Sequence, residues 1–289
     1  MVPPPLRHQP PVIVPGLPVA RPRRPRPARD LTLVLGAIPQ ETELVAWALA
    51  RKSRREFAGF PFIEGRIDGR RVIVAVTGIG KTNATLITTL FVEKFRPREV
   101  LMCGTASRID AAIRNGDVIV GEVTCNHDMG SLGAGYAMEY FGSEGPRGDH
   151  SPIVYPGDRR LLAAARRALR THIPETATHQ SPAYVPTVRC GRITSGDQFG
   201  ITAERIADIL RQLQPNLMEM ESGSVAQVCY YLRVPFLCIR SGSNRTQHSP
   251  DNDYRALSPF AARQAALFTV SLVRELARHP ARAGAARQP

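Results

Sequence analysis

Long apolar runs, paired cysteines and lysines are all scarce in this chain of 289 residues. No run reaches the roughly 18 apolar residues of a membrane span, and no apolar segment of a secretory signal precedes Asp30, so no membrane partner is expected. The five cysteines form no CxxC pair, which indicates reduced core residues of a cytoplasmic protein. With three lysines, the chain owes almost all its basicity to arginine.

The positive charge is concentrated at the two ends. Residues 1–29 hold ten prolines, six arginines and no acidic residue, and residues 280–289 add two arginines. Neither stretch can offset its ordering entropy by apolar burial, so both are predicted to be disordered around one domain at 30–279. Without these eight charges the formal net charge falls from +13 to +5. Nucleic acid is therefore not expected as a partner, apart from weak, sequence-independent contacts of the basic tail.

The body of the chain alternates short apolar strands with helices. Strands are predicted at 31–35, 71–76, 99–102, 117–123, 188–194, 216–220 and 234–240, and helices at 40–51, 81–95, 158–169, 202–213, 222–232 and 259–277. This pattern predicts an α/β fold with a mainly parallel sheet covered on both faces. Ligands of such sheets bind at the carboxyl ends of strands, where six polar or glycine-bearing loops fall, and a Gly-rich loop at 130–142 could cover the site.

Two carboxylates, Glu219 and Glu221, lie in an apolar stretch where a strand gives way to a helix. A carboxylate removed from water costs several kcal/mol unless it is paired or hydrogen-bonded. The pair therefore indicates a ligand with donor groups, or alternatively a salt bridge or helix cap.

Three other motifs fall short of a known chemistry. Residues 75–82 nearly form a phosphate-binding P-loop, but Ala75 stands where the first glycine belongs, so only an anion or a hydroxyl is expected at its amides. His127-Asp128 has no partner at a metal-ligand spacing and is predicted to be a surface or loop-anchoring pair. Ser195-Gly196-Asp197 is not part of a G-x-S-x-G nucleophile elbow. No metal or cofactor is expected.

The loops at the sheet end offer Glu41, Glu221 and Asn244, with Phe199 as a stacking surface. One carboxylate to activate water, another to hold hydroxyls and a face for an aromatic ring describe the cleavage of a sugar from a base.

Seven segments resemble, in order, those of the methylthioadenosine/S-adenosylhomocysteine nucleosidases of the purine nucleoside phosphorylase superfamily. They are residues 36–41 (GAIPQE), 77–81 (TGIGK), 104–106 (GTA), 115–117 (NGD), 195–199 (SGDQF), 218–221 (MEME) and 234–236 through 240–244 (VPF, RSGSN). The resemblance covers about residues 31–277. It implies a three-layer α/β/α phosphorylase-type sandwich with a central, mainly parallel mixed sheet, a homodimer and a purine nucleoside substrate.

The resemblance also implies roles for single residues. Glu41 resembles the general base that activates water, Glu221 the carboxylate that binds the ribose hydroxyls, and Met220 the side chain packed on the sugar. Phe199 resembles the residue that stacks on the base, and Thr77 the small hydroxyl residue near the water. Further substrate contacts are expected from three residues of the matching segments, Gly104, Thr105 and Ser243. Ionised carboxylates beneath the ring would stabilise the positive charge that develops on the ribose.

The chain departs from the family pattern at two places. Asn244 stands where the nucleosidases carry the Asp that protonates the purine, and an amide, which donates and accepts hydrogen bonds, suits a 6-oxopurine better than adenine. Arg108 follows Ser107 where the family has two glycines, and it could bind an anion of the substrate, crowd the pocket or face solvent. Met102 lies where phosphorolytic relatives place a phosphate-binding Arg, which favours water over phosphate.

The sequence therefore predicts a hydrolase that cleaves the N-glycosidic bond of a purine nucleoside of the methylthioadenosine/S-adenosylhomocysteine type, with Glu41 and Asn244 in the catalytic positions. Two alternatives stay open. One is a phosphorylase, or a nucleosidase of a 6-oxopurine or larger adenosyl conjugate. The other is a non-catalytic nucleoside-binding protein, in which Asn244 records lost chemistry.

Overall fold

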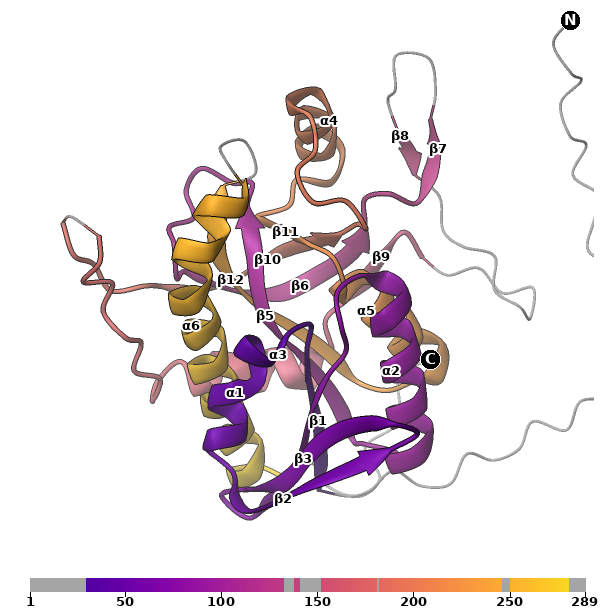
Figure 1. The fold of residues 1–289 in the computed structure, drawn as a ribbon, viewed down its shortest axis with the longest axis vertical. Coiled ribbons are helices and arrows are strands. Elements are labelled where there is room, and N and C mark those ends of the chain that lie inside the picture. The colour runs from indigo at the N-terminus through magenta and orange to yellow at the C-terminus, as the bar shows by residue number, and fades with distance from the viewer. Residues whose placement is uncertain (1–29, 133–137, 141–151, 181, 246–249, 281–289) are drawn as a thin grey trace, which may run out of the picture.

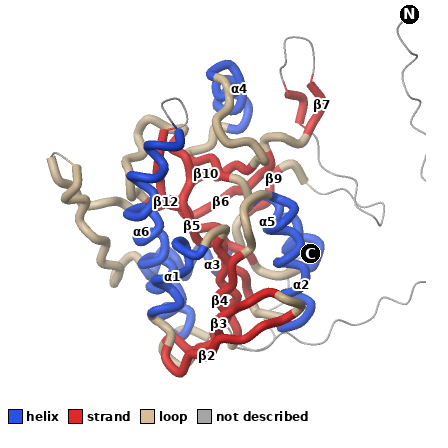
Figure 2. The backbone as a smooth tube through the Cα atoms, viewed as in Figure 1, coloured by secondary structure: helices blue, strands red, loops and turns tan. Residues whose placement is uncertain are grey.

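The computed structural model describes residues 30–132, 138–140, 152–180, 182–245 and 250–280. The predicted extension at 1–29 and nearly all of the predicted tail at 280–289 lie outside these residues. Within them, the chain forms one mixed sheet with helices on both faces (Figures 1 and 2), which confirms the predicted α/β sandwich.

The main sheet of the described residues has ten strands in the spatial order β11-β10-β6-β12-β5-β1-β4-β3-β2, with β9 beside β6. Their bounds are β1 Leu31–Gly36, β2 Ala50–Phe57, β3 Phe60–Ile67, β4 Arg70–Val76, β5 Glu99–Arg108, β6 Val118–Asn126, β9 Val154–Pro156, β10 Val188–Ser195, β11 Leu217–Glu219 and β12 Phe236–Arg245. A small hairpin pairs β7 (Gly130–Leu132) with β8 (Met138–Tyr140). The central strands β4, β1, β5 and β12 are parallel, and all of β1 is buried, as expected for a sheet covered on both faces.

In one half of the sheet, the edge strand β11 pairs with a second strand, β5, so this half closes on itself. The short strand β11 pairs in parallel with β10 on one side and antiparallel with β5 on the other, where Met218 lies opposite Ser107. The segment that carries Glu219 and Glu221 is thereby brought beside the carboxyl end of β5.

Helices form the two outer layers. Their bounds are α1 Pro39–Trp47, α2 Lys81–Phe95, α3 Arg159–Ala168, α4 Ala203–Leu213, α5 Ser222–Leu232 and α6 Pro250–Arg278. One hydrophobic core packs α2 and α5 against the sheet, and a second packs α1, α3 and α6 against its other face (Figure 1). α4 lies apart over a smaller cluster that includes Cys125 and Met218.

Helix α6 contains the most apolar long segment of the described residues. Its part from Tyr254 to Arg278 is long and apolar enough to cross a membrane by length and composition, but two thirds of it is buried inside the protein. It packs against α1, α3, β5 and β12. These contacts are those of a core helix.

The prediction was wrong at the end of the first helix. α1 stops at Trp47, whereas the helix was predicted to reach residue 51, and residues 50–67, mostly assigned to no element, form the β2–β3 hairpin. All but the last side chain of β2 are exposed, so this edge strand has no apolar alternation and is held by backbone pairing with β3. Its turn, Ala58-Gly59, has positive φ at both residues, which matches the twist of the flanking strands. The next turn, Asp68-Gly69, has the same geometry and a sequence typical of it.

A second boundary also differs from the prediction. α6 begins at Pro250 and contains Pro259, which had been predicted to start the helix. The predicted Gly-rich loop at 130–142 is partly the β7–β8 hairpin and partly outside the described residues, and its described part contributes no lining residue to the cavity described below.

Candidate active site

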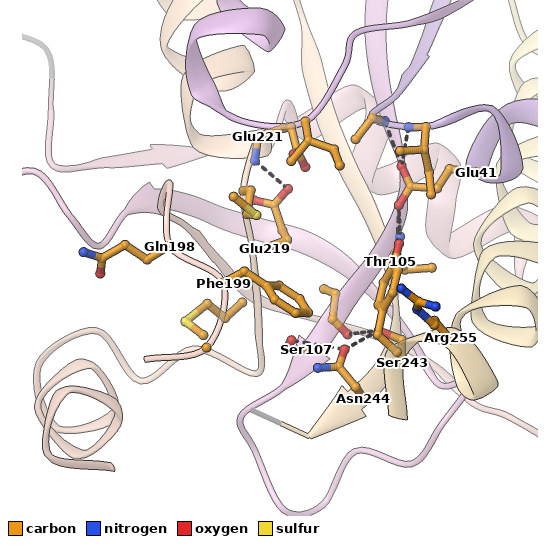
Figure 3. Close-up of a pocket in the computed structure, with 18 residues that line it drawn as sticks. Glu41, Thr105, Ser107, Gln198, Phe199, Glu219, Glu221, Ser243, Asn244 and Arg255 are labelled. Atoms are coloured by element: carbon orange, nitrogen blue, oxygen red, sulfur yellow. Dashed lines mark hydrogen bonds between the residues drawn. The ribbon is translucent and has the colours of Figure 1, made fainter. Parts of the chain in front are cut away.

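A cavity of about 440 Å³ opens at the carboxyl ends of the strands, a volume within the range of small-molecule sites. Its walls come from the loop between β1 and α1, the end of β5, the loop after β10, the segment from β11 to α5, the end of β12 and the start of α6. Seven of the predicted site residues line it, namely Glu41, Thr105, Phe199, Met220, Glu221, Ser243 and Asn244 (Figure 3).

Glu41 lies in the first turn of α1, where Pro39 starts the helix and the exposed amides favour a negative charge. One carboxylate oxygen accepts hydrogen bonds from the Ala37 N–H at 2.7 Å and, more weakly, from the Ile38 N–H at 3.4 Å. The other accepts from the amide and the hydroxyl of Thr105 at 2.7 and 3.0 Å. These donors fix the orientation of a buried carboxylate.

Gly104 allows this close approach between β5 and Glu41. A Cβ atom at this position would stand 2.5 Å from the Glu41 carboxylate and 2.3 Å from a nitrogen of Arg240. Gly104 was predicted as a substrate contact, but it does not line the cavity and instead makes room for the Glu41 carboxylate.

Glu221 ends the β11 segment at the start of α5 and is also buried. Its carboxylate accepts a hydrogen bond from the Gly80 N–H at 2.9 Å and another from Arg240 at 3.0 Å. Burial raises the pKa of Glu221 to about 8, and the positive charge of Arg240 opposes this rise.

Arg240 connects the carboxylates of the site, and sequence reasoning missed it. It is fully buried at the end of the apolar run of β12, and its guanidinium forms ion pairs with Glu41 at 3.5 Å, with Glu221 at 3.0 Å and with Glu219. The pKa of Arg240 is raised by these three carboxylates against the effect of burial. A charge inside an apolar strand segment, Phe236 to Arg240, was the available signal.

Glu219 has the capping role predicted as the alternative to ligand binding. Its carboxylate accepts hydrogen bonds from the backbone amides of Glu221 and Ser222 at 3.0 Å each, at the N-terminus of α5. Hydroxyls of Ser195 and Ser222 and the guanidinium of Arg240 complete its shell. A carboxylate so fully engaged stabilises the local fold.

Asn244 lies at the other end of the cavity from Glu221 (Figure 3). Its side-chain oxygen accepts from the hydroxyls of Ser243 at 2.9 Å and Ser107 at 3.2 Å, whereas its NH₂ group makes, with the described residues, one long contact of 3.5 Å to a backbone carbonyl. Asn244 therefore offers the cavity a hydrogen-bond donor.

Two aromatic rings close the cavity. Phe199, from the loop after β10, and Tyr254, from α6, meet edge to face with their centroids 6.0 Å apart. Burial raises the pKa of Tyr254, while a hydrogen bond with the Thr105 hydroxyl opposes the rise. Tyr254 was not predicted as a site residue, because the predicted helix began five residues after it.

Besides Gly104, two predicted site residues, Thr77 and Arg108, do not line the cavity. The hydroxyl of Thr77 donates to a backbone carbonyl of its own loop, that of Gly78, at 2.7 Å. The stem of Arg108 packs over Gly242 of β12. The cation that does line the cavity is Arg255, next to Tyr254 on α6.

The P-loop-like segment and the His127-Asp128 pair have structural partners. The Gly80 amide of the first binds the carboxylate of Glu221, so the anion expected at this helix N-terminus belongs to the protein itself. His127 is buried rather than at the surface, and burial lowers its pKa to about 4, whereas Asp128 anchors a loop as predicted. Among the described residues, no group of three or more His, Cys, Asp or Glu could hold a metal ion.

Comparison with known proteins supports the resemblance seen in the sequence. The model of the phosphorylase superfamily matches residues 32–278. A 5′-methylthioadenosine/S-adenosylhomocysteine nucleosidase of Psychromonas ingrahamii is 30% identical over 245 residues, which cover 84% of this chain and 98% of that protein.

Solved structures agree with this match. The 5′-methylthioadenosine/S-adenosylhomocysteine nucleosidase of Neisseria meningitidis, in complex with methylthio-immucillin-A, aligns with a TM-score of 0.72 and 29% identity over 85% of this chain and 99% of that one. The futalosine hydrolase of Helicobacter pylori aligns with a TM-score of 0.73 and 25% identity over 86% and 99%. The chain belongs to the phosphorylase superfamily.

Proposed function

We propose that the protein hydrolyses the N-glycosidic bond of a purine nucleoside of the methylthioadenosine/S-adenosylhomocysteine type and releases the free base. One observation carries the proposal. Two buried carboxylates, Glu41 and Glu221, lie in one cavity and share Arg240, with a hydrogen-bond donor and two aromatic rings at the base end. The nucleosidase relatives support the same reaction class.

We propose a separate step for each carboxylate. Glu41 takes a proton from water as the water oxygen bonds to C1′ of the ribose, and the C1′–N9 bond breaks with its electron pair going to the purine, which then takes a proton from solvent. Positive charge develops on the sugar, and Glu221, which accepts hydrogen bonds from the ribose hydroxyls, lies close enough to stabilise it. A well-placed proton acceptor contributes about 10² to 10⁴ in rate.

Asn244 acts on the leaving base. An amide cannot protonate the purine, but its NH₂ can donate a hydrogen bond to the charge that develops on the base. Because its oxygen is engaged by Ser107 and Ser243, the group presents a donor to the ligand. A donor matches the O6 acceptor of a 6-oxopurine and opposes the amino group of adenine, so we propose that hypoxanthine is released faster than adenine.

A second candidate reaction is phosphorolysis, and Arg255 is the observation that favours it. It is the one Lys or Arg among the described residues that line the cavity, and it makes no ion pair with any of them. Such a cation could hold inorganic phosphate, or an anionic group on the 5′ substituent of the nucleoside. Water remains the favoured nucleophile, because Glu41 and Glu221 line the same cavity and a negatively charged carboxylate there would repel a phosphate anion.

The experiment that tests the proposed function is a substrate screen with purified protein. Inosine, adenosine, methylthioadenosine and S-adenosylhomocysteine are incubated with and without phosphate, and released bases and sugars are identified by mass spectrometry. The proposal expects free base without phosphate. If ribose 1-phosphate forms, and only when phosphate is present, the reaction is phosphorolysis instead. If no base is released from any nucleoside, the protein is a nucleoside-binding protein.

We also propose that the protein is a cytoplasmic homodimer. Apolar side chains are exposed on one side of the molecule, formed by α2, α5 and β9, which pack on one another (Figure 1). They are Ile79, Leu86, Ile153, Val154 and Tyr230. Since Ile79 also lines the cavity, a second copy on this side would cover its edge. The thiols of all five cysteines are free, which agrees with a reducing compartment.

The dimer proposal has its own test. Analytical ultracentrifugation should give twice the mass of the chain for the wild type. Leu86→Asp on α2 should shift this to the monomer, because it places a charge in the contact. A wild type that sediments as a monomer would contradict the proposal.

A further inference from the structure

Three sequence motifs that the proposed reaction does not use meet at one point of the structure. They are the P-loop-like segment before α2, the His127-Asp128 pair after β6 and the Ser195-Gly196-Asp197 segment after β10. β6 and β10 are parallel neighbours, with Asn126 opposite Ser195, so the loops that follow them leave the sheet side by side.

Side chains close these three segments into a ring of hydrogen bonds. Asp128 accepts from Lys81 Nζ with one carboxylate oxygen, at 2.5 Å, and from the Asp197 N–H with the other, at 2.9 Å. Asp197 in turn accepts from the Lys81 N–H at 2.7 Å. We call these residues the Lys81–Asp128–Asp197 network.

The network supplies a cap that the sequence of α2 lacks. The residue before the helix, Gly80, has no side chain with which to accept from the first amides, and Asp197 accepts from one of them across the sheet end. Gly80 adopts a φ of 92°, and a Cβ there would lie 3.2 Å from the Asp197 carboxylate. Helix α2 and the loop after β10 are thus fastened to each other.

Each of the two segments that the network joins is next to the cavity. Phe199 follows Asp197 by two residues on the same loop and lines the base end. Gly80, next to Lys81, donates its N–H to Glu221. The network therefore sets the position of the aromatic face relative to the carboxylate for the ribose, although none of its three residues lines the cavity.

We propose that Asp128 is a positioning residue of the reaction. Its carboxylate accepts hydrogen bonds from both Lys81 and Asp197. It thereby holds Phe199 and Glu221 at the separation and orientation that a bound nucleoside requires. This inference rests on the proposed function, because it presumes a base at Phe199 and a ribose at Glu221. A displacement of about 1 Å in a residue that positions the substrate can lower the rate on the order of 10²-fold.

The test compares Asp128→Ala and Lys81→Met with a matched control, Glu64→Ala. Glu64 forms an ion pair with Arg71 on β3 and β4, and its side chain has the same exposed fraction as that of Asp128, 19%. We expect kcat/KM for base release to fall on the order of 10²-fold in both network variants and by less than twofold in the control. Equal losses in Asp128→Ala and Glu64→Ala would overturn the proposal.

A double-mutant cycle separates positioning from a loss of fold. In a Phe199→Ala background the aromatic face is already gone, so Asp128→Ala should cost at least tenfold less than it costs in the wild type. If Asp128→Ala lowers kcat/KM in the Phe199→Ala background as much as in the wild type, Asp128 acts through the stability of the fold rather than through Phe199. The melting temperature of each variant is measured alongside.

Failure of the proposed function can be distinguished from failure of this inference. If the wild type releases no base, the reaction is wrong, and calorimetry with adenine then tests the network alone. Asp128→Ala should weaken adenine binding on the order of 10-fold relative to Glu64→Ala, the size of one lost base–aromatic stack. Equal affinities would overturn the positioning role.

Discussion

Replacing Glu221 by Gln should change how the stability of the protein depends on pH. Burial raises the pKa of Glu221 from 4.5 to about 8, so between these values the folded protein holds a proton that the unfolded chain releases. The stability that this proton confers is fully present below about pH 4.5 and is lost as the pH rises through about 8. Gln imitates the protonated acid at every pH.

The size of the effect follows from the difference in pKa. Each unit corresponds to about 1.4 kcal/mol, so the full difference amounts to at most about 5 kcal/mol. Wild type and Glu221→Gln should therefore have similar free energies of unfolding near pH 5, and the variant should be more stable by several kcal/mol near pH 9.

Urea unfolding followed by circular dichroism, repeated across this pH range, measures the difference. Glu43→Gln, on the exposed side of α1, is the control and should leave the pH profile of the wild type unchanged. A difference between wild type and Glu221→Gln that stays constant with pH would refute the reasoning, because it would mean that burial does not hold a proton on Glu221.

The same proton links stability to function. Ribose hydroxyls donate to an ionised carboxylate, so substrate binding at neutral pH should release a proton from Glu221. Calorimetry in buffers of different ionisation enthalpy detects this release, which Glu221→Gln should abolish. Proton release that persists in Glu221→Gln would assign it to another group.

Three further substitutions test single residues. Glu41→Gln should lower kcat by about 10² to 10⁴ while calorimetric ligand binding persists, and retained turnover would remove Glu41 from the mechanism. Asn244→Asp should raise the rate of adenine release relative to hypoxanthine, as followed by chromatography of the free bases; an unchanged ratio would contradict the donor role of Asn244. Arg240→Met should destabilise the protein by about 3 to 5 kcal/mol in urea, because it leaves buried carboxylates without their cation, and a near-neutral effect would contradict the role of Arg240 as their counter-ion.

Much of the cavity could be predicted from the sequence because its residues directly follow apolar strands. Phe199 lies in the loop after β10, Glu41 and Glu221 lie at the start of the helix that follows a strand, and Asn244 lies at the end of β12; the strands bring these positions to one end of the sheet. Arg240 was predictable in principle, as a charge in a strand that must be buried.

Other parts depended on long-range contacts. Arg108 was predicted to bind an anion, crowd the pocket or face solvent, but β5 continues to this residue, and its stem packs onto Gly242. Arg255 replaces it at the cavity, on a helix whose start was hidden by an internal proline, Pro259. The β2 strand was missed because its polar side chains carry no signal of the backbone pairing that forms it.

The most direct test of the proposed hydrolysis is the fate of the oxygen that attacks C1′. Purified protein is incubated with a purine nucleoside in ¹⁸O-labelled water, with phosphate present, and the sugar product is analysed by mass spectrometry. The proposal predicts free ribose, or its 5′-substituted form, that carries the heavy oxygen, and it predicts that Glu41→Gln forms this product about 10² to 10⁴ times more slowly. Unlabelled sugar 1-phosphate, or intact nucleoside after prolonged incubation, would contradict it.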